Sequence, residues 1–114
     1  MNDKYILDEN DNPVLEPDLM KWSAWYEANR DKRRVARDKV GEYEVSTVFL
    51  SFDHGWDGGP PVLWETMIFG GKYDDWINEY QVRYTSLADA KAGHAEAVAL
   101  ASQPEATRKF KGEI

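Results

Sequence analysis

The sequence predicts an α+β two-layer sandwich, with an antiparallel sheet of about four strands plus an N-terminal hairpin, and two helices packed on one face. Two segments rich in β-branched and aromatic residues, 43–52 and 62–69, are joined by a glycine-proline loop, as in an antiparallel pair. Segments with helical spacing of apolar residues stand before and after this strand region. The order hairpin, helix, strands, helix favours an α+β fold.

The first thirty residues predict a hairpin followed by a helix. Residues 5–7 and 13–15 are short apolar segments around the polar turn 8–12. Pro17 suits the first turn of a helix that is capped by Asp18 or Glu16 and runs to about residue 29. Its apolar face is formed by Leu19, Trp22, Trp25 and Tyr26, and we expect the indoles to pack on the sheet.

The middle and the end of the chain supply the remaining elements. Residues 34–40 predict a strand, and Gly41 opens a two-residue type II′ turn into the next one. If Phe52 faces Val62, Glu65 lies opposite Phe49. Residues 72–79 predict a loop and residues 80–84 a strand. Ser86 and Asp89 form a capping-box pattern at the start of the last helix, and Pro104 follows its end.

Length and composition limit the kind of protein. The chain has 114 residues, 42% of them hydrophobic and 31% charged, which predicts one globular domain over 1–104 and a polar, flexible tail over 105–114. No apolar run approaches a membrane span, and we expect no signal peptide. The absence of cysteine excludes disulfides and thiolate chemistry and fits a reducing cytoplasm. We expect no metal and no cofactor.

The charge balance bears on partners. The net charge of −7 argues against direct binding to nucleic acid or to an anionic membrane, which need a surplus of Lys and Arg. Six of the fourteen basic residues lie within 30–39, whereas 40–98 holds ten acids against three bases. The basic run lacks interleaved aromatics, so it indicates a solvated helix end. A protein partner, and a homodimer, remain open.

The loop 53–61 is the first candidate site, because long loops on rigid strands often carry function. Three interpretations stay open: a rigid turn, a protein-binding loop with an exposed tryptophan, or a base and metal-ligand cluster built on its acids and its histidine. The binding residues that we predict are Asp53, His54, Trp56, Asp57, Gly58 and Gly59.

Glu65 and His94 complete the catalytic candidates, with Asp53 and His54. Glu65 stands within an apolar strand, where a carboxylate needs a partner; a salt bridge to Arg34, Arg37 or Arg83 would supply one. His94 falls on the apolar face of the last helix, where a hydrogen-bonded core histidine is the usual case. Walker, dinucleotide-binding, zinc-protease and nucleophile-elbow motifs are absent from the sequence.

Several stretches resemble a family of small uncharacterised proteins of tailed bacteriophages and prophages. They are Tyr5-Ile-Leu-Asp8 with Asn12-Pro-Val14, Val45-Ser-Thr-Val-Phe-Leu50, Asp53-His54, Gly59-Pro-Pro61, Glu65-Thr-Met-Ile-Phe-Gly70, and Arg83-Tyr84 with Ala92-Gly-His-Ala95. The resemblance implies a phage gene product in the host bacterial cytoplasm. It supplies no reaction and no catalytic residue.

Three functions are therefore considered. The first is a small acidic phage accessory protein, not an enzyme, that binds a host or phage protein as an inhibitor of host defence or a host takeover factor. The second is a small-ligand-binding or metal-assisted hydrolytic protein that uses the Asp53-His54 loop, and it requires the four catalytic candidates to converge around a pocket. The third is a minor structural virion component.

Overall fold

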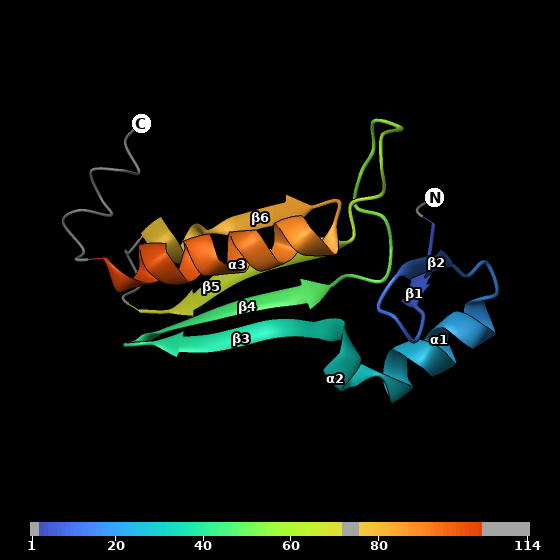
Figure 1. Ribbon diagram of the computed structural model, residues 1–114, viewed down its shortest axis with the longest axis horizontal. Helices are drawn as coiled ribbons and strands as arrows, with labels where there is room; N and C mark the ends of the chain where they lie inside the picture. The colour runs from blue at the N-terminus through green and yellow to red at the C-terminus, as the bar shows by residue number, and fades with distance from the viewer. Residues whose placement is uncertain (1–2, 72–75, 104–114) are drawn as a thin grey trace.

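The computed structural model describes residues 3–71 and 76–103 (Figure 1). Its elements are β1 (Tyr5–Leu7), β2 (Pro13–Leu15), α1 (Leu19–Ala28), α2 (Arg30–Arg33), β3 (Arg34–Val40), β4 (Tyr43–Phe49), β5 (Trp64–Gly70), the 3-10 helix η1 (Trp76–Glu79), β6 (Gln81–Tyr84) and α3 (Leu87–Ser102). The four strands β3 to β6 form an antiparallel sheet in sequence order, and β1 pairs with β2 in a separate hairpin. The predicted α+β class is confirmed.

Local sequence signals account for the ends of several elements. Gly41 has a φ of 60°, whereas Glu42 keeps a negative φ, which fits the type II′ turn predicted between β3 and β4. The Asp18 carboxylate accepts hydrogen bonds from the backbone N–H groups of Met20 and Lys21 and caps α1. The Ser86 hydroxyl accepts one from the N–H of Asp89 and caps α3.

The core lies between the sheet and α3, which runs along one face of it (Figure 1). Alternate residues of β4 are buried, and the inward residues of β5 lie directly opposite them. Small residues on the inner side of α3 let the helix approach the sheet closely. The inward residues are Tyr43, Val45, Thr47 and Phe49 of β4, Trp64, Thr66 and Ile68 of β5, and Ala90, Gly93, Ala97 and Ala101 of α3.

Helix α1 joins the hairpin to the end of the sheet. The Trp22 indole N–H donates to the carbonyl oxygens of Tyr5 and Ser51, at 3.2 and 3.0 Å. The Trp25 ring meets Phe49 of β4 edge-on, with 6.0 Å between centroids. Both indoles therefore anchor α1 as predicted for its apolar face, but Leu19 is 58% exposed and does not contribute to the core.

The strand pair β4–β5 is shorter than predicted and its register is shifted by one residue. Ser51 has a φ of 70°, so the chain bends away from the sheet, and the following residue, Phe52, pairs with Lys4 beside the hairpin. Phe49 faces Trp64, and Glu65 faces Val48, not Phe49. A shift of one residue turns a side chain to the other face, so Glu65 lies on the face away from α3.

Two further sequence predictions concern the loop expected over residues 72–79 and the C-terminal tail. Residues 76–79, predicted as loop, form η1, and Ile77 within it is fully buried in the core. Residues 72–75 and the tail 105–114 lie outside the described part of the chain. None of the helices in the described ranges is long and apolar enough to cross a bilayer.

Candidate functional site

The base of the 53–61 loop is closed by Asp53. Its Oδ1 accepts hydrogen bonds from the backbone N–H groups of Gly55 and Val62, at 2.7 and 2.9 Å. The N–H of His54 donates to the Val62 carbonyl oxygen across the same gap, at 2.9 Å. The carboxylate thus ties the two arms of the loop together, and its contacts are those of a structural residue.

His54 is held on the outer side of this closure. Its Nδ1 lies 2.9 Å from the Phe52 carbonyl oxygen, which can only accept, so Nδ1 carries a hydrogen. The imidazole also stacks on the Phe52 ring, with 4.5 Å between centroids. These contacts fix the ring orientation and leave Nε2 as the nitrogen without a hydrogen bond in the described part of the chain.

The tip of the loop presents an indole to solvent. Trp56 is 93% exposed, more than any other large hydrophobic residue of the described ranges. Beside it, Asp57 accepts a hydrogen bond from the N–H of Gly59, and Gly58 has a φ of 78°, a conformation that favours glycine. Figure 1 shows the loop between β4 and β5 rising away from the sheet and from α3.

Glu65 is a paired structural carboxylate on the face of the sheet away from α3. Its Oε2 accepts hydrogen bonds from Arg83 Nε at 2.8 Å and from Gln81 Nε2 at 2.9 Å, both on the neighbouring strand β6. Arg83 was one of the three partners predicted for it. Arg37, another of the three, pairs with Glu44; this contact raises the pKa of Arg37 and lowers the pKa of Glu44.

His94 belongs to a chain of hydrogen bonds between α3 and the sheet. Its Nε2 lies 2.7 Å from Asp38 Oδ2, and its Nδ1 lies 2.7 Å from Thr47 Oγ1. The Thr47 hydroxyl is 2.5 Å from that of Thr66, and all but Asp38 are buried. The sequence predicted a hydrogen-bonded core position for His94 but did not indicate its two partners, although Thr47 stands between two apolar residues of the buried face.

The structure does not bring the four catalytic candidates together. Glu65 and His94 lie on opposite faces of the sheet, and Asp53 and His54 make their hydrogen bonds within the loop. The described residues contain no group of three or more His, Asp or Glu side chains placed to hold a metal ion. The buried threonine hydroxyls next to His94 are closed to a substrate, so the arrangement is that of a core network.

Comparisons with known proteins add no identity: no family model, no curated protein and no solved structure matches the chain.

Proposed function

We propose that this protein is a small acidic accessory protein of a phage that binds a host or phage protein through the loop 53–61. The observation that carries the proposal is the Trp56 side chain, 93% exposed at the tip of a loop whose base is tied by hydrogen bonds. The phage origin, and action in the host cytoplasm as a host takeover factor or an inhibitor of host defence, rest on the sequence resemblance.

An exposed indole on a constrained loop suits recognition for two reasons. Tryptophan is enriched among the residues that dominate binding energies, because it buries a large apolar area at little cost in side-chain entropy. A loop that already holds its bound shape loses less conformational freedom on binding than an unconstrained one. In this loop Asp53 and Asp57 both restrain the backbone around Trp56.

The charge of the chain indicates what kind of surface a partner would present. The net charge is −7, and the loop itself carries two acidic residues and no basic one. The expected partner surface is therefore an apolar slot for the indole with Lys or Arg at its rim. A hydrolytic role is the weaker alternative, because Asp53, Glu65 and His94 make hydrogen bonds to neighbouring parts of the fold.

Affinity capture from bacterial lysates tests the proposal with three versions of the full chain: wild type, Trp56→Ala and Met20→Ala. Met20 is 79% exposed on α1 and serves as the matched apolar control. We expect wild type and Met20→Ala to retain the same partner at physiological salt, and Trp56→Ala to bind it at least about tenfold more weakly. Both variants should unfold within about 0.5 kcal/mol of wild type.

Two outcomes would contradict the proposal. One is the absence of any specific partner at physiological salt, and the other is a partner that Trp56→Ala binds as tightly as wild type. The remaining possibility is a structural virion component. Mass spectrometry of purified phage particles tests it, since a stoichiometric signal would assign the chain to the virion.

A further inference from the structure

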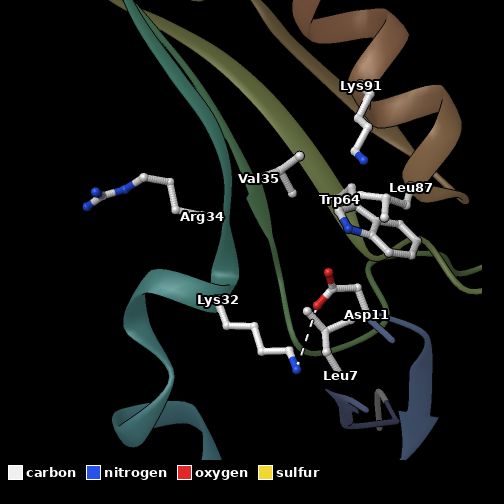
Figure 2. Close-up of a pocket in the computed structure, with 8 residues that line it drawn as sticks. All are labelled: Leu7, Asp11, Lys32, Arg34, Val35, Trp64, Leu87 and Lys91. Atoms are coloured by element: carbon white, nitrogen blue, oxygen red, sulfur yellow. Dashed lines mark ion pairs between the residues drawn. The ribbon is translucent and has the colours of Figure 1, made fainter. Parts of the chain in front are cut away.

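A pocket of about 150 Å³ opens where the hairpin, the start of β3 and the start of α3 meet (Figure 2), and no residue of the 53–61 loop lines it. It is lined by four apolar side chains, three basic ones and one acidic one. The apolar set is Leu7, Val35, Trp64 and Leu87, and the charged set is Lys32, Arg34, Lys91 and Asp11. The apolar residues belong to the hydrophobic cluster at this end of the core, whereas the three basic side chains have no part in the core or in the proposed function.

The apolar part of the lining is held in place by the core. Trp64 is 2% exposed and Leu7 6%, so each reaches the pocket with only a small part of its surface, and the half-buried Val35 and Leu87 supply most of the accessible apolar wall. The Trp64 ring packs against Phe49 at 5.6 Å between centroids, which fixes its position from behind. The small accessible part of the indole can touch a bound ring, but it cannot stack beneath one.

The charged part of the lining has a surplus of positive charge in a chain whose net charge is −7. Lys32 is partly neutralised, since its Nζ lies 3.6 Å from Asp11 Oδ1 and donates to the Asp8 carbonyl oxygen. Lys91 and Arg34 have no ion pair within the described residues. Figure 2 shows Lys32 and Lys91 on either side of the pocket, with the Trp64 indole and Asp11 between them, whereas the Arg34 guanidinium points outward.

We propose that this pocket binds a small aromatic acid, one ring that carries a carboxylate or a phosphate, with the ring against Val35 and Leu87 and the anionic group at Lys91. The volume agrees with this size, because an apolar protein cavity of about 150 Å³ is known to hold benzene. A bare anion would leave the apolar wall uncovered, and a neutral ring would make no use of the Lys91 ammonium. A charge-assisted hydrogen bond to Lys91 would make an aromatic acid bind more tightly than the neutral ring.

Titration of the isotope-labelled full chain, followed by NMR, tests this inference with four probes. Phenyl phosphate and benzoate are the aromatic acids, benzamide is the neutral ring, and inorganic phosphate is the anion alone. We expect saturable shifts at Val35, Trp64 and Leu87 with at least one aromatic acid. Benzamide and inorganic phosphate should bind about tenfold more weakly, the effect of one charge-assisted contact. The comparison of the two acids identifies the anionic group.

Variants connect the effect to Lys91. Lys91→Gln should weaken binding of the aromatic acid about tenfold and leave benzamide binding unchanged. Lys39→Gln, which removes the same charge near the far end of β3, should change neither, and Trp56→Ala should change neither. If Lys91→Gln alters the fold, Lys32→Met is a second variant that removes one positive charge from the pocket lining.

The inference would be overturned by any of three results: no saturable shift with either aromatic acid, shifts that map outside the pocket, or equal affinity for benzamide. An unchanged affinity in Lys91→Gln would equally contradict it. Because the pocket and the 53–61 loop are tested by different variants and readouts, failure of one proposal leaves the other standing.

Discussion

Each nitrogen of the His94 ring has one partner of definite hydrogen-bonding role. Asp38 as a carboxylate can only accept, so Nε2 of His94 carries a hydrogen and donates to it. In the neutral ring Nδ1 then accepts the hydrogen of the Thr47 hydroxyl, and the Thr66 hydroxyl donates to Thr47. Every group in this buried chain is satisfied, as polar groups in a protein core have to be.

Replacement of Thr47 by valine tests this network. The side chains are nearly equal in shape, but the variant leaves His94 Nδ1 and the Thr66 hydroxyl buried without their partner. We expect a loss of about 1–3 kcal/mol in the free energy of unfolding, measured by urea denaturation. Thr85→Val, an exposed position, should stay within about 0.5 kcal/mol of wild type. If Thr47→Val leaves the free energy of unfolding unchanged, the network does not stabilise the fold.

At the scale of elements, the contact between α3 and the sheet depends on small side chains. Gly93 in the middle of α3 faces the Tyr84 phenol of β6, and a Cβ added at Gly93 would lie well inside contact distance of that ring. The Tyr84 hydroxyl is buried there and has no hydrogen-bond partner in the described part of the chain. The close approach of ring and helix backbone is thus a packing requirement met by glycine.

Gly93→Ala separates packing from helix propensity. Alanine favours a helix by about 1 kcal/mol over glycine, so propensity alone predicts a stabilised variant. We expect the opposite, a loss of about 1–3 kcal/mol, because the added methyl overpacks the contact with Tyr84. In the Tyr84→Ala background the same substitution should become neutral or stabilising. Thermal or urea unfolding of the four chains measures the coupling, and a stabilised single variant would refute the packing argument.

At the scale of the whole molecule, acid should reduce stability through paired carboxylates in different elements. The pKa of Asp8 lies below its ordinary value of 3.8, mainly because the backbone N–H of Asn12 donates to the carboxylate. The hydrogen bond from Arg37 holds the pKa of Glu44 below its ordinary value of 4.5. A lowered pKa in the folded state means that the unfolded chain binds more protons in this range, so each group stabilises the fold above its ordinary pKa.

The stabilisation by Asp8 and Glu44 should be lost as pH falls below these ordinary values and through the folded-state pKa values. We expect the urea midpoint of wild type to drop between about pH 6 and about pH 3. Asp8→Asn combined with Glu44→Gln keeps hydrogen-bond acceptors but removes both charges, so its midpoint should drop less over the same range. Asp31→Asn, at an exposed acidic position, serves as the control. Equal drops in the double variant and wild type would contradict the assignment.

Local signals in the sequence were sufficient for the class of fold and for several element ends. Hydrophobic periodicity placed α1, α3 and the strands, but not the short helices α2 and η1. Asp18, Gly41 and Ser86 marked a helix start, a turn and a second helix start. The loop around Trp56 was also predictable, because glycine and proline on either side of Trp56 and Asp57 exclude regular structure, whereas exposure of the indole was one of three open interpretations. These features depend on residues a few positions apart, and such residues interact in any fold that contains them.

Long-range register and partner choice were decided only by the tertiary structure. The chain bends toward the hairpin at Ser51, and β4 pairs with β5 one residue away from the predicted register, which places Glu65 beside Arg83 on the face away from α3. His94 meets Asp38 and Thr47, which lie 56 and 47 positions away in the sequence. The pocket likewise joins side chains from four separate segments. A strand alternates its faces with every residue, so periodicity predicts that a face exists, and only the packed chain determines which side chains meet across it.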